Sequence, residues 1–107
     1  MGQGGYRRPQ GYPGRSLKRI HRRIFRLNDE IASLDEELRL IGAELGHHRL
    51  IDDDAQRDAV IGNYIDREEA GLTSGDVRRF ENTIEQLRRR RAKLVNRRDL
   101  LVTRLVD

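Results

Sequence analysis

Aliphatic residues recur at alternating intervals of three and four residues through the first half of the chain. The positions are Leu17, Ile20, Ile24, Leu27, Ile31, Leu34, Leu38, Ile41 and Leu45. A heptad repeat sustained over this length favours a helix that supercoils around a partner, because the apolar stripe of an ordinary amphipathic helix drifts around its axis. The pattern predicts a long helix over about residues 16–50.

A second seam follows in the last third of the chain. Its apolar positions are Val77, Phe80, Ile84, Leu87, Leu94, Leu101 and Leu105. Arg91 and Arg98 stand where the repeat calls for apolar residues. Thr73 and Asp76 have the spacing of a capping box, in which two side chains satisfy free backbone N–H groups at a helix start. We therefore expect a second long helix over about residues 74–106.

The segment between the two seams predicts a separate short helix. Gly42 and Gly46 weaken the first helix, and the three aspartates at 52–54 suit a helix start, because carboxylates favour the positive end of the helix dipole. A short apolar stripe follows, formed by Val60, Ile61, Tyr64 and Ile65. We place this helix at about residues 53–69, lying against the end of the two long helices.

The two seams interlock if the long helices run antiparallel with residue numbers that sum to about 125. Ile31 then faces Leu94, and the acids at 35–37 lie opposite the arginines at 88–90. A slip of one heptad would keep the apolar match but lose this charge match. We expect an all-α fold, an antiparallel coiled-coil helical hairpin with a short intervening helix and a flexible N-terminal tail.

The predicted tail, residues 1–15, holds five glycines and both prolines of the chain. Such a segment cannot bury enough apolar surface to offset the entropy lost on ordering, so the folded hairpin is expected to occupy residues 16–107. Arginines in the tail alternate with Tyr6 and Tyr12, a composition that suits contact with phosphates and stacking on bases. An inert tail is the alternative interpretation.

Charge is distributed unevenly along the chain, whose net charge is +4. Residues 1–26 carry eight basic and no acidic side chains, residues 27–86 carry six and sixteen, and residues 87–107 carry eight and two. A chain that folds back once gathers both basic ends at one pole, where we expect an anionic partner to bind. The residues assigned to this contact are Arg7, Arg8, Arg15, Lys18, Arg19, Arg22, Arg23, Arg97 and Arg104. Arg26, Lys93 and Arg98 belong to the same pole, and a merely solvated basic end is the alternative.

Five apolar residues near the basic pole lie outside both seams, and Leu100 and Val106 are two of them. The three that we single out are Phe25, Val95 and Val102. An additional apolar stripe on a helix pair favours docking of a further helix, from a second copy or from another protein. We assign these residues to self-association or to a partner helix, and expect a homo-oligomer or a subunit of an assembly.

Few side chains offer catalytic or metal-binding chemistry. The chain has no cysteine, and none of its three serines has the sequence context of a nucleophile. Adjacent His47 and His48 would point about 100° apart on a helix, so they cannot chelate one metal ion. No run of about 20 apolar residues is present. We predict no enzyme activity, catalytic residue, cofactor or metal, and a soluble cytoplasmic protein without membrane contact.

One stretch of the chain resembles the all-helical chorismate mutases, which combine a long, a short and a medium helix. The resemblance lies at residues 31–38, residues 54–57, Val77, Phe80 and Ile84. Asn28 and Leu45 stand where we align the cationic substrate ligands of that family. The resemblance therefore implies a degenerate helical relative of these enzymes.

The aspartates near the expected turn resemble the coiled-coil arm of the Gre transcription-elongation factors. They are Asp52, Asp53, Asp54 and Asp58. In that family, carboxylates at the tip reach the active site of RNA polymerase and help to hold a magnesium ion. The resemblance implies an RNA-polymerase-binding factor with an acidic tip.

Taken with the charge pattern, these features predict a non-enzymatic coiled-coil adaptor or structural factor. It would dock through its arginine-rich pole and tail onto an anionic partner, either nucleic acid or a nucleoprotein assembly. The competing class is a purely protein-binding coiled-coil subunit of a larger assembly, whose charges serve only pairing and solubility.

Overall fold

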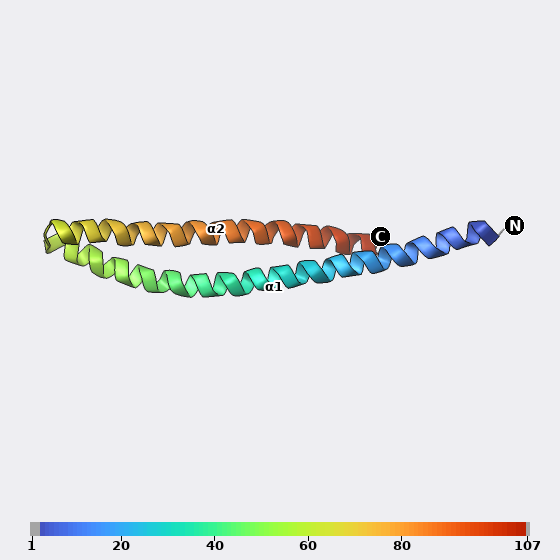
Figure 1. Ribbon diagram of the computed structural model, residues 1–107, viewed down its shortest axis with the longest axis horizontal. Coiled ribbons are helices and arrows are strands. Elements are labelled where there is room, and N and C mark those ends of the chain that lie inside the picture. Colours follow the sequence, from blue (N-terminus) through green and yellow to red (C-terminus); the bar gives the residue numbers. More distant parts are fainter. Residues whose placement is uncertain (1–2, 107) are drawn as a thin grey trace. The chain divides into compact units, whose positions relative to one another are not determined.

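The computed structural model describes the backbone of residues 3–106 and the side chains of residues 17–106. It contains two α-helices, α1 (Gln3–Ile61) and α2 (Tyr64–Val106). The chain reverses at Gly62 and Asn63, so segments of the two helices lie side by side and antiparallel (Figure 1). The predicted all-α antiparallel helical hairpin is confirmed.

Both helices contribute to two compact units. The basic unit contains residues 1–33 and 91–107, and the acidic unit contains residues 34–90. The basic unit has thirteen basic and four acidic side chains, a net charge of +9. The acidic unit has nine basic and fourteen acidic side chains, a net charge of −5. The division along the sequence is therefore also a division of charge.

Each unit has a narrow apolar core where α1 and α2 meet. The buried residues of the basic unit are Ile24, Ile31, Leu94 and Leu101, and those of the acidic unit are Leu34, Leu45, Ala55, Ala70 and Ile84. All of them occupy heptad positions, as expected when two helices wrap around a shared seam. Burial of these side chains supplies most of the helical stability, because isolated helices gain little from propensity alone.

The predicted boundary of the first helix near residue 50 is wrong. The helix α1 continues without a break to Ile61, and its heptad positions continue through His48, Asp52, Ala55 and Ala59, all at least half-buried. The His48 ring stacks on Phe80 of α2 with ring centroids 4.6 Å apart. Small and polar side chains therefore extend the seam where no aliphatic residue marks it.

The predicted short helix over residues 53–69 is not formed as a separate element. Residues 53–61 are the end of α1, Gly62 and Asn63 make the turn, and residues 64–69 begin α2. The predicted helix start near residue 74 is wrong for the same reason, because Thr73 and Asp76 lie inside α2. Thr73 donates a hydrogen bond to the Asp52 carboxylate and Asp76 pairs with Arg79, so neither side chain caps a helix.

The capping box of α2 is formed by Asn63 and Asp66. The Asn63 Oδ1 atom accepts hydrogen bonds from the backbone N–H groups of Ile65 (3.0 Å) and Asp66 (3.2 Å). The Asp66 carboxylate accepts a hydrogen bond from the Asn63 N–H (3.2 Å). These reciprocal bonds satisfy backbone donors that a helix start leaves free, and the Asp66 charge favours the positive end of the helix dipole.

Gly62 is required by close approach at the turn. A Cβ atom at this position would overlap the Asp66 carboxylate and lie 2.5 Å from the backbone carbonyl oxygen of Asp58. The carbonyl belongs to the helix backbone and cannot swing away as a side chain can. The residue after α1 must therefore lack a side chain.

A polar layer crosses the seam of the acidic unit at Asp52. Its Oδ1 atom accepts hydrogen bonds from Gln56 Nε2 (3.0 Å), Thr73 Oγ1 (2.7 Å) and Ser74 Oγ (3.1 Å). Gln56 Nε2 also lies 3.0 Å from the backbone oxygen of Ala70. A polar group at a seam position specifies register, since sliding either helix breaks its bonds.

The predicted register agrees with a hydrogen bond between the helices in each unit. Asp52 bonds Thr73, and in the basic unit Arg98 Nη1 donates to Asn28 Oδ1 at 3.2 Å, so the paired numbers sum to 125 and 126. Arg49 reaches Glu81 at 3.9 Å, a sum of 130, because long side chains span an additional turn. A slip of one heptad would separate all of these pairs.

The first fifteen residues were predicted to form a flexible tail. The helix α1 includes residues 3–15 of this segment, whose side chains are not described. The flexibility of the tail therefore stays a prediction, and the predicted contacts of Arg7, Arg8 and Arg15 lie outside the described side chains.

Candidate anion-binding site

Four arginines of α1 share one face of the helix in the basic unit. Arg19, Arg22, Arg23 and Arg26 follow the spacing i, i+3, i+4 and i+7 and line a surface hollow of about 400 Å³. Residues at this spacing lie above one another on a helix that rises 1.5 Å per residue, so the row extends over roughly 10 Å. This row forms one half of the site.

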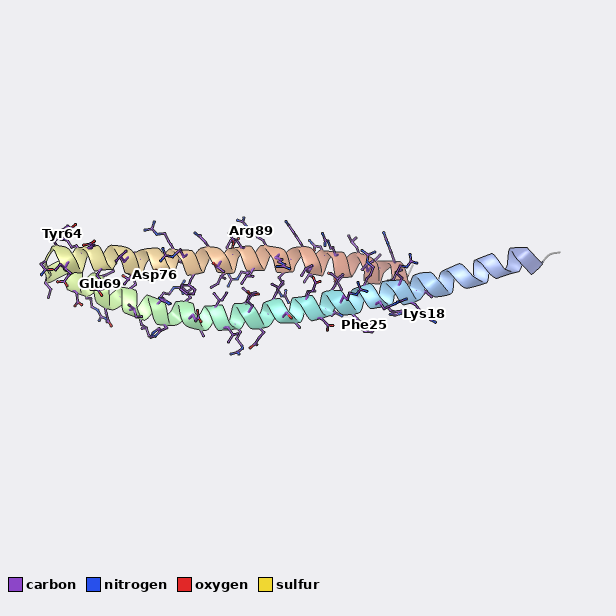
Figure 2. The ribbon with its side chains drawn as sticks, in the orientation of Figure 1. Lys18, Phe25, Tyr64, Glu69, Asp76 and Arg89 are labelled. Carbon is purple, nitrogen blue, oxygen red and sulfur yellow. The ribbon has the colours of Figure 1, made fainter. Side chains whose placement is uncertain are left out.

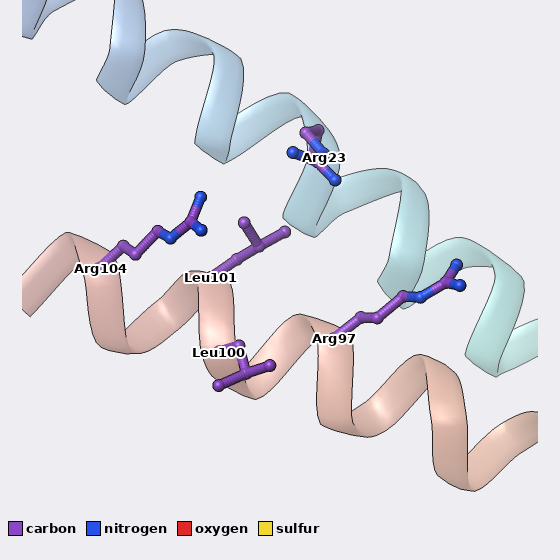
Figure 3. A pocket seen from close by; sticks show the side chains of 5 residues that line it. All are labelled: Arg23, Arg97, Leu100, Leu101 and Arg104. Atoms are coloured by element: carbon purple, nitrogen blue, oxygen red, sulfur yellow. The ribbon is translucent and has the colours of Figure 1, made fainter.

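Arginines of α2 complete the site beside a small apolar floor. Arg97 and Arg104 stand one heptad apart, with Leu100 and Leu101 between them, and with Arg23 they line a hollow of about 200 Å³ (Figure 3). Leu101 is buried in the seam, whereas Leu100 is exposed. Arg23 borders both hollows. We call Arg19, Arg22, Arg23, Arg26, Arg97 and Arg104 the arginine cluster.

The antiparallel arrangement explains why these side chains meet. Arg23 directly precedes the seam residue Ile24, and Arg104 directly precedes the seam position Leu105. In an antiparallel helix pair, residues that precede the seam on one helix flank the same side as those that precede it on the other. The heptad positions of the arginines thus place both rows along one side of the basic unit.

The arginine cluster has no carboxylate partner among residues 17–106. Within residues 17–106, none of its six guanidinium groups makes an ion pair or hydrogen bond to another side chain. The acidic unit differs, because each of its arginines at positions 39, 49, 57, 79 and 89 pairs with a carboxylate. Six like charges held this close repel one another, and a bound anion relieves that repulsion.

Among the other predicted cations, Lys18 is exposed on α1 and lines neither hollow. Arg98 differs from the cluster, since its Nε donates to Asp99 Oδ1 at 3.2 Å while its Nη1 bonds Asn28. Arg91 is also engaged in an interaction. The sequence analysis placed Leu100 in the additional apolar stripe and did not identify it as a floor between Arg97 and Arg104, two arginines one heptad apart.

The acids at 35–37 and the arginines at 88–90 were expected to form salt bridges between the helices. This expectation is wrong for Glu36 and for Arg89. Glu36 pairs with Arg39 and Arg89 with Glu85, in both cases on the same helix. The hydrogen bond from Arg39 lowers the pKa of the Glu36 carboxyl below its ordinary value. Pairs spaced by three or four residues on one helix form at lower entropic cost than pairs between helices. Glu36 and Arg89 therefore pair within their own helices.

The apolar residues assigned to a partner helix are only partly exposed. Phe25 is 64 % exposed and stacks on His21 with ring centroids 6.4 Å apart. In Figure 2 its side chain projects from α1 on the side away from α2. Val102 is 41 % exposed, and Val95 is half-buried beside the seam residue Leu94. The three residues do not line either hollow of the arginine cluster.

The turn between the helices is apolar and not an acidic tip formed by Asp52–Asp54. Asp52 is half-buried in the polar layer and Asp54 pairs with Arg57, both well inside α1. The residues that flank the turn are instead Val60, Ile61, Tyr64 and Ile65, and all four are exposed. Sequence reasoning placed these residues in a short packed helix, because it did not identify Gly62 and Asn63 as the turn.

Within the described residues, no group of three or more His, Asp or Glu side chains is arranged to hold a metal ion. Over the same range, neither helix has a stretch apolar and long enough to cross a membrane. Comparison of the chain with protein-family models, with curated proteins and with solved structures finds no match. The arginine cluster is the strongest functional feature that the described side chains provide.

Proposed function

We propose that this protein is a non-enzymatic coiled-coil adaptor whose arginine cluster binds the phosphate backbone of nucleic acid. The observation that carries the proposal is the contrast between the units. Six arginines of the basic unit line two hollows and have no carboxylate partner within residues 17–106, whereas the acidic unit pairs most of its own arginines.

The chemistry of arginine supports phosphate as the ligand. Arginine outnumbers lysine by twenty to two in this chain. The planar guanidinium fork matches phosphate oxygens and makes bidentate hydrogen bonds, and neutralising several phosphates releases condensed counterions. Two rows of exposed arginines, which contact phosphates and not base edges, favour binding that depends on charge and not on sequence.

The predicted tail adds to the same surface. Its Arg7, Arg8 and Arg15 extend the basic stretch N-terminal to Arg19, and Tyr6 and Tyr12 offer rings on which unpaired bases can stack. In this proposal the folded hairpin holds the duplex or strand through phosphates, and the tail extends the contact along it.

Salt titration of binding to fluorescently labelled duplex DNA and to single-stranded RNA tests the proposal. The triple variant Arg23→Gln, Arg97→Gln, Arg104→Gln removes three charges from the cluster. The matched control removes three from exposed positions of the acidic unit, Arg67→Gln, Arg78→Gln and Arg90→Gln. For duplex DNA, the cluster variant should lower the slope of log affinity against log salt by about 0.9 per lost contact.

Two results would reject the proposal. One is that the native chain fails to bind either nucleic acid at low ionic strength. The other is that both triple variants lose the same affinity, because net charge alone would then account for the binding.

A purely protein-binding role is the second candidate, and the exposure of Phe25 favours it. A ring that is 64 % exposed on a helix pair offers an anchor for a partner helix. Replacing Phe25 by Ser should abolish capture of such a partner and leave the salt-dependent binding of nucleic acid unchanged. Loss of nucleic-acid binding in this variant would contradict the separation of the two surfaces.

A further inference from the structure

The turn of the acidic unit carries an apolar patch that the fold leaves uncovered. Val60 is 84 % exposed, Ile61 90 %, Tyr64 71 % and Ile65 67 %. Figure 2 shows Tyr64 at the turn. Single exposed hydrophobic residues are common on protein surfaces, but four large ones within six consecutive positions concentrate exposed apolar surface at the turn, and such surface marks binding sites.

Charge around the patch restricts what can cover it. Residues 58–69, on either side of the turn, contain four acidic and one basic side chain, a net charge of −3. Two such turns brought together would repel each other, and an anionic membrane surface would repel the turn as well. The complementary surface is therefore an apolar recess with a positively charged rim.

The basic unit of the same chain provides a recess of this kind. Leu100 and Leu101 form its floor, and Arg23, Arg97 and Arg104 stand around it (Figure 3). Leu100 is 69 % exposed, so the floor is open to a ligand. Its volume of about 200 Å³ suits one or two aliphatic side chains and not a whole helix.

We propose that the apolar turn of one copy docks into the arginine-rimmed recess of a second copy. The contact is heterologous, since it joins two different surfaces, and each added copy leaves one turn and one recess unfilled at the ends. Copies therefore associate head to tail into open chains, or into a ring if the rotation closes. The docking rests on the arginine cluster of the proposed function but does not require nucleic acid.

The small size of the contact and its charged rim predict how the association depends on protein concentration, salt and DNA. Interfaces at the low end of the size range are transient, and exposed ion pairs are screened by salt. Association should therefore grow with protein concentration and weaken with added salt. Duplex DNA should dissociate the chains, because it competes for the same arginines.

Sedimentation velocity over a concentration series at low salt tests the proposal with three single variants. Ile61→Asp places a charge in the patch, and Leu100→Ser removes the exposed part of the floor while keeping every arginine. Leu50→Asp is the matched control, because Leu50 is 65 % exposed on α1 in the same unit as Ile61. Ile61→Asp and Leu100→Ser should both remain monomeric, and Leu50→Asp should associate like the native chain.

Mixing the two monomeric variants distinguishes head-to-tail docking from other contacts. Ile61→Asp keeps an intact recess and Leu100→Ser keeps an intact turn, so a mixture should form one-to-one dimers and nothing larger. A symmetric contact between turns predicts instead that Leu100→Ser still forms dimers with itself and that the mixture contains no dimer of the two variants. That result would overturn the proposal, as would a native chain that stays monomeric or an Ile61→Asp variant that associates normally.

Nucleic-acid binding by the same variants separates this proposal from the proposed function. Ile61→Asp should bind duplex DNA like the native chain under conditions where both are monomeric, because Ile61 lies outside the arginine cluster and its apolar floor. Normal DNA binding without any self-association would overturn the docking alone, whereas self-association without DNA binding would overturn the nucleic-acid role alone. If Ile61→Asp lowers the helix content measured by circular dichroism, Tyr64→Ser replaces it, and its normal association would equally contradict the proposal.

Discussion

At the scale of single residues, polar side chains decide where the hairpin turns and how its helices align. Asn63 and Asp66 cap α2 by exchanging hydrogen bonds, and Gly62 leaves room for the backbone between them and α1. Asp52 aligns the helices through the hydrogen bonds that Thr73 and Ser74 of α2 donate to its carboxylate. These few groups act against slippage, which apolar packing alone tolerates.

Asp52 should make stability depend on pH in the acid range. Its hydrogen bonds, first that from Gln56 and then that from Thr73, lower the pKa of the carboxyl below the ordinary 3.8. The unfolded chain binds the proton more tightly, so this contribution is fully present above the ordinary pKa and is lost as the pH falls through the lower pKa of the folded state. The variant Asp52→Asn should lose less thermal stability than the native chain between about pH 5 and about pH 2.

The control for this measurement is Asp53→Asn, because the adjacent Asp53 side chain is exposed and makes no hydrogen bond among the described residues. It should follow the native chain over the acid range. An identical acid response of Asp52→Asn and the native chain would show that the polar layer does not hold the charged carboxylate.

Substitution at the turn glycine should be distinguishable from substitution at other glycines. Gly62→Ala forces a Cβ atom against the Asp58 carbonyl and should destabilise the hairpin by about 1–3 kcal/mol. Gly71→Ala, at an open position inside α2, should stabilise it by about 0.5–1 kcal/mol, the ordinary preference of a helix for alanine. Urea unfolding monitored by circular dichroism measures both, and equal changes would argue against the close approach.

At the scale of elements, both helices are held by a heptad seam that only partly consists of aliphatic residues. It starts with aliphatic layers in the basic unit and continues in the acidic unit with a His48–Phe80 stack, the Asp52 polar layer and the buried Ala55 and Ala70. Such layers contribute less apolar burial than leucine, so the helix segments near the turn depend more on capping and hydrogen bonds.

Truncation of an aliphatic seam residue should cost far more than truncation of a residue on the outer surface. Leu94→Ala removes a side chain that is 6 % exposed and should lower the free energy of unfolding by about 2–5 kcal/mol. Leu40→Ala, at a position that is 50 % exposed, should change it by less than about 1 kcal/mol. Thermal or urea unfolding measures the difference, and similar losses would show that the seam is not the main source of stability.

At the scale of the whole molecule, the net charge is divided between the two compact units, so that each unit carries mainly one sign. The basic unit combines both ends of the chain and carries +9, and the acidic unit carries −5. The arrangement favours association between unlike units of different copies and attracts polyanions to one unit. Both proposals made above depend on this separation.

Removal of the tail tests whether it takes part in binding. Deleting residues 1–15 removes three arginines, so it should weaken binding to duplex DNA and lower the salt slope by up to about 0.9 for each arginine that contacts a phosphate. The truncated chain should keep the melting temperature of the native chain, measured by circular dichroism, because the first buried seam residue among those described is Ile24. Unchanged affinity would identify the tail as a spacer.

Much of the fold could be predicted from the sequence, but the site only in part. The aliphatic heptads around Ile31 and Leu94 define both long helices, and the basic ends identify which residues carry the arginine cluster. The turn was missed because Asp52–Asp54 and Thr73 have strong helix-start chemistry of their own, although each of them also has a favourable place inside a helix. The start of α2 is instead at Asn63 and Asp66, which follow a glycine and give a weaker signal in the sequence.

The sequence by itself determined that the chain forms an antiparallel helical hairpin. It also determined that the two ends of the chain are basic and that its middle is acidic. These properties follow from the spacing of residue types, which any helical fold-back preserves. Only the tertiary structure decided where α1 ends, which carboxylate each arginine pairs with, and that Leu100 lies between Arg97 and Arg104 as an open floor. These outcomes depend on competition among several local partners of similar strength, and the packing of one helix against the other selects between them.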